Sequence, residues 1–365
     1  MSSNVEHMQY AIRLAKKGRY TTDPNPCVGC VIVNDGKVVG EGWHMRAGEP
    51  HAEVNALKQA GSNAKGATVF VTLEPCSHTG RTPPCAEALI AADVKKVFVA
   101  MVDPNPLVAG EGLKKLEAAH IEINSGLLES QARALNLGFI KRMESNRPFV
   151  RVKLAMSLDG RTAMASGESQ WITGDAARND VQFLRAESSA ILTGIETVLV
   201  DNPSMNVRLS AQELEVDLVR QPKRIVLDSQ FRMLSDVNIT SSDDKCIVYT
   251  TVNVDNKNQY PFNIEKIDTH DKQIDLHALM KDLAKKEVNM LHVEAGSVLC
   301  GALLKNDLVD EIIIYMAPHI MGDSARGLFH LPELEQMKDR VSLKINDVRA
   351  IGNDIRITAE PIYHQ

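Results

Sequence analysis

The sequence lacks the features of a membrane-bound or secreted protein. No apolar run approaches the roughly 18 residues of a membrane-spanning helix. The amino terminus carries Glu6, His7 and Arg13 where a signal peptide requires an apolar block. Six cysteines in 365 residues are too few for a disulfide scaffold. We therefore expect a soluble, cytoplasmic protein.

An excess of positive charge is also lacking. The chain holds 41 lysines and arginines against 47 aspartates and glutamates, a formal net charge of −6. Nonspecific nucleic-acid binding depends on neutralising many phosphates, which makes a mildly acidic chain a poor candidate for it. The composition, 44% hydrophobic and 24% charged, is that of a globular protein. We expect neither a nucleic-acid partner nor a membrane partner.

At roughly 150 residues per domain, the length predicts two domains. Expected strands and helices alternate over residues 4–136, which is typical of a three-layer α/β sandwich, and Asn34-Asp35-Gly36 predicts a hairpin between the first two strands. The polar segment 144–148 interrupts this alternation, which then restarts. We place the boundary there, giving α/β domains over 1–145 and 146–365, the second closed by two antiparallel strands.

A metal-binding pattern occupies the first domain. His51-Ala52-Glu53 opens an expected helix, and Cys76 and Cys85 follow it. One imidazole and two thiolates supply three ligands to Zn²⁺ and leave the fourth position for water, whose pKa zinc lowers so that hydroxide becomes available. Glu53 would carry the proton. This is the pattern of the zinc-dependent nucleobase deaminases, except that eight residues, not two, separate the cysteines.

An alternative zinc site uses a different ligand set. Cys27 and Cys30 form a CxxC pair that could join Cys76 and Cys85 in a structural four-cysteine site. The region would then be a binding module and not an enzyme. Such a site leaves His51 and Glu53 unexplained, so the deaminase interpretation is favoured.

Four strings resemble the pyrimidine deaminase domain of the bifunctional riboflavin biosynthesis deaminase–reductase family. They are PNPxVG at 24–29, GEPHAE at 48–53, TLEPCSHTGRTPPC at 72–85 and DPNP at 103–106. The long cysteine spacing is this family's own version of the motif. The resemblance implies a cytidine-deaminase-like fold and a phosphoribosylamino diaminopyrimidinone substrate. It also implies substrate contacts from Asn25, His44, His78, Arg81, Asp103 and Asn105.

The second domain has its most informative string at 291–302, LHVEAGSVLCGA. A strand enters a glycine turn and a helix begins at once, which is either a phosphate site or simply a turn. The string resembles the same family's reductase domain, as do KLAMSLDGR at 153–161, SQWIT at 169–173 and TGxxTVLxDNP at 193–203. The resemblance implies a dihydrofolate-reductase-like fold and NADPH as cofactor.

The residues that the resemblance implies in this domain fall into two groups. The expected NADPH contacts are Ala155, Trp171, Thr197, Asp201, Ser229, Gly296, Ser297, Val298, Leu299, Cys300, Gly301 and Ala302. The expected substrate contacts are Ser169, Arg185, Met205, Arg208 and Glu294.

Together the two domains predict consecutive steps on one small-molecule substrate. Zinc-dependent deamination of the pyrimidine would precede NADPH-dependent reduction of the ribosyl group to ribityl. An RNA- or DNA-editing deaminase with an accessory domain is the rival interpretation, which the acidic charge and the long cysteine spacing disfavour. Edge strands in both domains favour a homo-oligomer, a dimer or tetramer.

Overall fold

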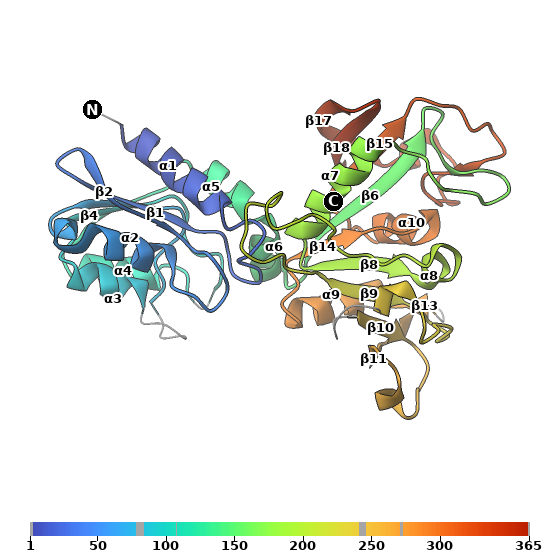
Figure 1. Ribbon diagram of the computed structural model, residues 1–365, viewed down its shortest axis with the longest axis horizontal. Helices are drawn as coiled ribbons and strands as arrows, with labels where there is room; N and C mark the ends of the chain where they lie inside the picture. Colours follow the sequence, from blue (N-terminus) through green and yellow to red (C-terminus); the bar gives the residue numbers. More distant parts are fainter. Residues whose placement is uncertain (1–2, 78–83, 107, 241–245, 271–272, 364–365) are drawn as a thin grey trace. The chain divides into compact units, whose positions relative to one another are not determined.

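Figure 1 shows the chain as a computed structural model. The structure describes residues 3–77, 84–106, 108–240, 246–270 and 273–363. The chain divides into two compact units, Met1–Arg147 and Pro148–Gln365. This division falls two residues after the boundary expected from the sequence. Each unit is described by itself.

The first unit is built around one five-stranded mixed sheet in the order β2-β1-β3-β4-β5. Strand β1 is antiparallel to both of its neighbours, whereas β3, β4 and β5 are parallel. The strands are β1 (Gly29–Asn34), β2 (Lys37–Trp43), β3 (Thr68–Val71), β4 (Lys96–Val99) and β5 (Glu122–Ser125). The helices are α1 (Asn4–Lys16), α2 (Ala52–Ala60), α3 (Cys85–Ala91), α4 (Glu111–Ala118), α5 (Glu129–Leu135) and α6 (Leu137–Ser145), with a 3₁₀ turn at Gly61–Ala64.

Helices cover both faces of this sheet because its inner strands, β1, β3 and β4, are apolar on both sides. In β3, Val69 and Val71 pack with residues of α2, α3 and α4, while Phe70 between them packs on the opposite face with α1. Figure 1 shows α2, α3 and α4 on one face of the sheet and α1 on the other. The predicted three-layer sandwich is confirmed. The hairpin is confirmed as well, since Asp35 and Gly36 both have positive φ between β1 and β2.

The second unit is built around a nine-stranded sheet in the order β11-β10-β9-β8-β14-β6-β15-β18-β17. Its strands are β6 (Phe149–Ser157), β8 (Ala190–Gly194), β9 (Lys223–Leu227), β10 (Cys246–Thr250), β11 (Asn263–Lys266), β14 (Met290–Val293), β15 (Glu311–Ala317), β17 (Ser342–Ile351) and β18 (Asp354–Ile362). Two short pairs lie outside it, β7 (Arg161–Ala163) with β16 (Arg326–Gly327) and β12 (Thr269–His270) with β13 (Gln273–Ile274). The helices are α7 (Asp175–Glu187), α8 (Ile195–Asp201), α9 (Leu276–Lys285) and α10 (Ser297–Lys305), with 3₁₀ turns at Asn238–Thr240, Lys257–Gln259 and Met337–Asp339.

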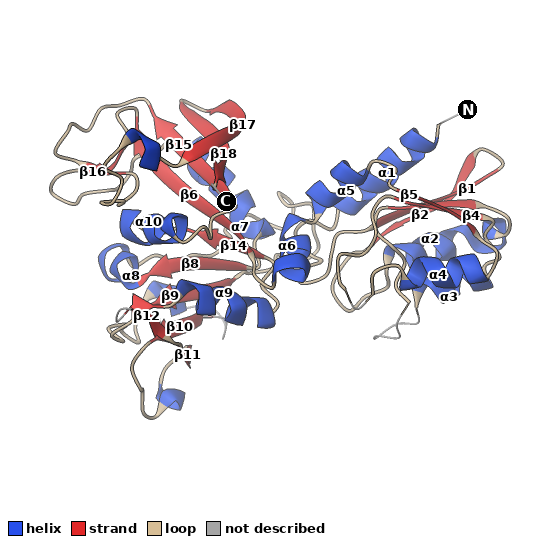
Figure 2. Cartoon of the chain, turned by 180° about the vertical axis from the view of Figure 1, so that it is seen from behind, coloured by secondary structure: helices blue, strands red, loops and turns tan. Residues whose placement is uncertain are grey.

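The first seven strands in this sheet order, from β11 through β15, run parallel to one another. Strands β18 and β17 close the sheet as the predicted antiparallel pair. Figure 2 shows this sheet with its strands in red. Residues of α9 and α10 pack on one face, and residues of α7 and α8 pack on the other. The parallel arrangement brings the carboxyl ends of β6, β8, β9 and β14 to one edge, where ligands of open α/β sheets bind.

Two helices were not expected from the sequence. Helix α6 continues from α5 almost to the boundary, and α8 fills the turn after β8. The sequence also indicates loops at 201–222 and around 241–245. The structure has no helix or strand at 202–222, whereas Asp201 ends α8, and residues 241–245 lie outside the described residues.

Candidate active sites

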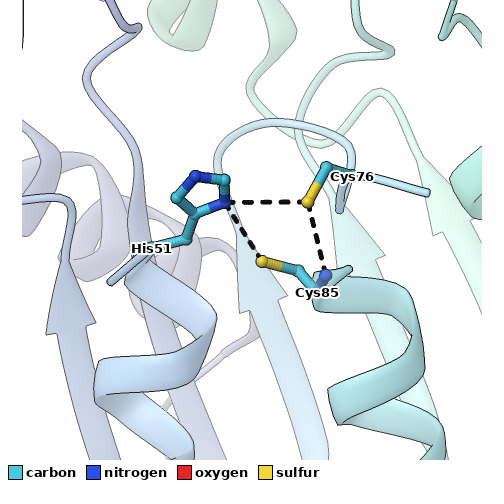
Figure 3. A group of neighbouring side chains, drawn as sticks. All are labelled: His51, Cys76 and Cys85. Atoms are coloured by element: carbon cyan, nitrogen blue, oxygen red, sulfur yellow. Dashed lines mark hydrogen bonds between the residues drawn. The ribbon is translucent and has the colours of Figure 1, made fainter. Parts of the chain in front are cut away.

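Three predicted ligands meet at one edge of the first unit's sheet. His51 caps the amino terminus of α2, Cys76 lies in the loop after β3, and Cys85 is the first residue of α3. His51 Nδ1 lies 3.3 Å from Cys85 Sγ and 3.6 Å from Cys76 Sγ. Figure 3 shows the three side chains turned toward one another. The structure thus brings together residues that are 34 positions apart in the chain.

Their spacing fits a tetrahedral metal. With nitrogen at about 2.1 Å and sulfur at about 2.3 Å from Zn²⁺, a nitrogen and a sulfur ligand lie about 3.6 Å apart. The two N–S distances agree with this value, and the three ligand atoms all lie within 4.8 Å of one another. The contact between the two thiols lowers the pKa of Cys76 and raises the pKa of Cys85, so Cys76 is the more readily ionised of the two.

Glu53 lies beside this group in the second position of α2. Its side chain is buried, and its carboxyl group contacts the Cys85 side chain. Burial raises the pKa of Glu53 to about 7. A carboxyl group with a pKa near neutrality can both accept and donate a proton under physiological conditions.

The four-cysteine alternative does not match the structure. Among the described residues, His51, Cys76 and Cys85 are the one group of His, Cys, Asp and Glu side chains that could hold a metal ion, and Cys27 and Cys30 are not in it. Cys30 is fully buried in the core beneath α2, and the Cys27 thiol contacts the Thr22 hydroxyl at 3.3 Å. The CxxC pair therefore packs as small side chains.

Two expected substrate contacts border the metal site. The Asn25 side-chain amide lies 3.1 Å from His44 Nε2, and the His44 ring meets the His51 ring edge-on at a centroid distance of 5.3 Å. His44 is buried, and this burial lowers its pKa.

The buried Asn136 fixes the loop that carries Asn25. Its side-chain oxygen accepts the Cys27 N–H at 2.7 Å, and its amide donates to the Cys27 carbonyl at 3.0 Å. Asn136 was missed by sequence reasoning because its role depends on a contact 109 positions away.

The remaining expected contacts of this unit divide into two pairs. Asp103 and Asn105 follow β4, and the Asn105 N–H donates to Asp103 Oδ1 at 2.9 Å. The Asp103 N–H donates to the buried carboxylate of Glu74, which stands two residues before Cys76. His78 and Arg81 lie outside the described residues.

In the second unit, Arg185 and Glu294 form a buried ion pair. Arg185 Nε lies 2.6 Å from Glu294 Oε1, and Arg185 Nη2 lies 3.0 Å from Glu294 Oε2. Arg185 also donates to the Asn206 carbonyl at 2.9 Å, and His292 Nε2 lies 3.3 Å from Glu294 Oε1. The two expected substrate contacts therefore hold each other in place at the carboxyl end of β14.

Lys153 on β6 belongs to the same cluster and was missed by sequence reasoning. Burial lowers the pKa of Lys153, while the charge of Glu294 raises it and that of Arg185 lowers it. The signal that could have indicated it was a lysine near the middle of a largely apolar strand, because a cation is rarely buried there without a partner.

Of the other expected substrate contacts, Met205 and Arg208 lie in the loop after α8. Arg208 lines a polar cavity of about 220 Å³ together with Arg178 and Gln182, and Gln182 Oε1 accepts the Arg208 N–H at 2.9 Å. Met205 is buried against Ile191 and other core residues, which leaves its backbone for any substrate contact. Ser169 is half-buried in the loop that follows β7.

The expected cofactor contacts follow the carboxyl ends of adjacent strands. Thr197 and Asp201 lie on α8 after β8, Ser229 follows β9, and Gly296 caps α10 after β14. The Gln170 amide donates to Asp201 Oδ1 at 3.0 Å, which ties the loop of Trp171 to α8. Trp171 is 72% exposed, and the Arg178 guanidinium lies over its ring at 4.8 Å. Ala155 lies on β6 itself.

Residues 296–302 differ in whether they face open space or pack in the core. A Cβ added to Gly296 would meet nothing within 4 Å, and Val298 is 66% exposed, so the start of α10 faces open space. By contrast, Cys300 is buried in the core, and a Cβ on Gly301 would lie 2.3 Å from the His330 carbonyl oxygen. Space beside the free N–H groups of α10 fits a dinucleotide phosphate, whereas Cys300 and Gly301 serve packing.

The comparisons with known proteins identify the family of the chain and of each of its two domains. Residues 1–101 match the cytidine and deoxycytidylate deaminase zinc-binding region, and residues 148–357 match the RibD C-terminal domain. The riboflavin biosynthesis protein RibD of Escherichia coli is 51% identical over 96% of this chain and 97% of its own length. The Haemophilus influenzae RibD is also 51% identical, over 99% of this chain and 98% of its own. The chain belongs to the RibD family.

A solved RibD structure is similar to this chain over nearly its whole length. The Acinetobacter baumannii RibD, form 1, superimposes with a TM-score of 0.92 at 47% identity and covers 98% of this chain and 99% of its own. As a RibD protein, the chain is a bifunctional deaminase and reductase of riboflavin biosynthesis, with a zinc-binding deaminase domain and an NADPH-dependent reductase domain. Within the described residues, no helix combines the length and the apolar character needed to cross a membrane.

Proposed function

We propose that the first unit deaminates a phosphoribosylamino diaminopyrimidinone and that the second unit then reduces the ribosyl group of the product. The observation that carries the first assignment is the group of His51, Cys76 and Cys85 with Glu53 buried beside it. A solved relative from Thermotoga maritima, 32% identical and with a TM-score of 0.85, is named as a deaminase and reductase of these compounds.

His51, Cys76 and Cys85 would hold Zn²⁺ in the first unit. Zinc at such a site lowers the pKa of water towards neutrality. The Glu53 carboxylate would take a proton from that water and deliver it to the leaving amino group, which departs as ammonia while the ring carbon gains a carbonyl oxygen. Burial suits Glu53 to this task because it keeps the two protonation states close in free energy near neutral pH.

Asn25, His44, Asp103 and Asn105 would hold the pyrimidine ring and the sugar. The Asn25–His44 contact lies next to His51, which supports a place for the ring close to the metal. His78 and Arg81 would meet the phosphate, a dianion that needs local cations in a chain of net negative charge.

In the second unit, NADPH would lie along the carboxyl edge of the sheet, where it supplies the hydride. The N–H groups at 296–299 would receive its phosphates, and Ala155, Trp171, Thr197, Asp201 and Ser229 would contact the remainder. Arg185, Arg208, Glu294, Ser169 and the backbone of Met205 would hold the substrate, with its sugar C1′ toward the cofactor. We add Lys153 to this set, because its charge interacts with those of Arg185 and Glu294.

A mass-resolved product assay with the diaminopyrimidinone substrate tests both halves. Without NADPH, we expect the deaminated, unreduced compound; with NADPH, we expect the ribityl product. Removing zinc with a chelator should abolish deamination and leave reduction of the supplied intermediate intact. Serine at Cys27 and Cys30 should retain zinc and activity. If no amino group is lost with zinc supplied, the deaminase assignment of His51, Glu53, Cys76 and Cys85 is wrong.

We also propose a cytoplasmic location and a homo-oligomeric state. None of the six cysteines, all of them described residues, is in a disulfide bond, which suits a reducing compartment. Strand β17 ends the nine-stranded sheet and carries Ile345 and Val348 with more than half of each side chain exposed, which favours a covered edge. Light scattering on the purified chain tests the homo-oligomeric state, since a monomer would contradict it.

A further inference from the structure

Glu74 stands between β3 and the zinc ligand Cys76 and is only 4% exposed. Both of its carboxylate oxygens accept backbone N–H groups from a distant part of the first unit. Oε2 accepts from Asp103 at 3.1 Å and Gly110 at 3.0 Å, and Oε1 accepts from Gly112 at 2.9 Å and Leu113 at 3.4 Å. Hydrogen bonds to a charged acceptor in a buried place are among the stronger ones in proteins.

These donors stand at the two ends of one segment. Asp103 opens the stretch that carries Asn105, and Gly110 and its successors form the start of α4. One carboxylate therefore closes this stretch at both ends. Helix α4 also approaches the segment before Cys76 closely: a Cβ on Gly112 would lie 2.0 Å from the Pro75 carbonyl oxygen.

A simple helix cap does not account for this arrangement. A residue next to α4 could cap it locally, as Ser, Thr, Asp and Asn commonly do. Here the acceptor lies 36 positions before Gly110, two residues from a zinc ligand, and it also binds Asp103, which is outside the helix. The contacts thus join the metal-binding segment to the segment with the expected substrate contacts.

We propose that Glu74 is a positioning residue for deamination, which sets Asp103 and Asn105 at the distance from Cys76 that the substrate ring requires. This inference rests on the proposed function of the first unit. Glutamine at this position keeps the size of the side chain, but its amide nitrogen would face N–H donors. The segment would then shift, and a displacement of about 1 Å at a reacting pair can cost roughly a hundredfold in rate.

The test compares Glu74→Gln with Glu111→Gln in the full-length, zinc-loaded chain. Glu111 is a matched control, because it lies on α4 with half of its side chain exposed and pairs only locally with Lys114. We expect Glu74→Gln to raise the KM of deamination about tenfold or more, with a smaller change in kcat, full zinc content and unchanged reductase activity. Glu111→Gln should leave KM, kcat, zinc content and reductase activity unchanged. An unchanged KM in Glu74→Gln overturns the proposal.

If Glu74→Gln loses zinc or fails to fold, a second variant tests the proposal. Lys115 Nζ donates to the Ser77 carbonyl at 2.7 Å and to Glu87 on α3 at 3.2 Å, so it ties the outer side of α4 to the same metal-binding segment and to the helix that begins at Cys85. We expect Lys115→Met to raise the KM of deamination by a smaller factor, whereas Lys114→Met, which removes only the local pair with Glu111, should not. Equal KM values in these two variants would overturn the proposal.

Asn105→Ala separates this inference from the function on which it rests. If Asn105→Ala raises KM and Glu74→Gln does not, the substrate contact stands and the inference fails. If Asn105→Ala leaves KM unchanged, the proposed substrate segment is wrong and the inference fails with it. If both raise KM, the double variant should raise it by less than the product of the two factors, because both changes act on one contact.

Discussion

Breaking the Arg185–Glu294 ion pair should destabilise the second unit strongly. The two side chains are only 10% and 12% exposed, and they share two hydrogen bonds of 2.6 and 3.0 Å. Glu294→Gln keeps the shape of the side chain but leaves the Arg185 charge buried without a counter-charge. Removing one partner of such a pair costs about 3–5 kcal/mol, because the remaining charge has lost its water and its partner.

The pH dependence of this stabilisation follows from the pKa of Glu294. Burial by itself raises this pKa, but the charge of Arg185 and the hydrogen bond from His292 hold it well below its usual range. The folded state therefore binds this proton less readily than the unfolded state. The stabilisation is present above the unfolded-state pKa of about 4.5 and is lost as the pH falls through the lower folded-state pKa.

Hydrogen exchange of peptides from β8 and β14, followed by mass spectrometry, measures the opening free energy of the second unit separately from the first. The double variant Arg185→Met/Glu294→Met should recover most of the loss, since no unpaired charge of the pair remains. Glu196→Gln is the control, because its pair with Arg232 is exposed at 73% and 42% and contributes little. If Glu294→Gln costs no more than this control, the reasoning is refuted.

Three further outcomes are expected. Glu53→Gln should abolish deamination at every pH while zinc content and NADPH-dependent reduction stay unchanged, which the product assay and metal analysis would measure; residual deamination near the wild-type rate would exclude proton transfer by Glu53. Asn136→Leu removes both hydrogen bonds to Cys27 and should lower the free energy of unfolding of the first unit by about 1–3 kcal/mol and raise the KM of deamination, with reductase kinetics as the internal control. Gly296→Val fills the open space before α10 and should weaken NADPH binding, measured by calorimetry, without changing the melting temperature; unchanged affinity would place the cofactor phosphates elsewhere.

Much of the first unit follows from the sequence because its signals are local. The alternation of short apolar strands with helices and the Asn34-Asp35-Gly36 turn depend on residues within a few positions of one another. The metal ligands could be predicted for a related reason. Zinc restricts the residue types that bind it, so His51, Cys76 and Cys85 are recognisable although they lie far apart.

In the second unit, the sequence predicted the closing antiparallel pair and the position of the glycine turn at 296, because strand and turn preferences are again local. It did not predict the edge strand β11. It did not predict which of the residues after the turn face a ligand. The packing of Cys300 in the core and of Gly301 against His330 depends on how α10 lies on the sheet. Which side of a helix is buried depends on the elements that pack against it, and these are not its neighbours in the sequence.

The ties between segments were decided by tertiary structure alone. Glu74 binding the start of α4, Asn136 binding Cys27 and Arg185 pairing with Glu294 each join residues between 36 and 109 positions apart. A buried carboxylate, amide or guanidinium must find a partner because it has left water. The sequence alone determined which residue types carry the chemistry; only the fold decided which partners hold them in place, because those partners are brought close by chain folding and not by position along the chain.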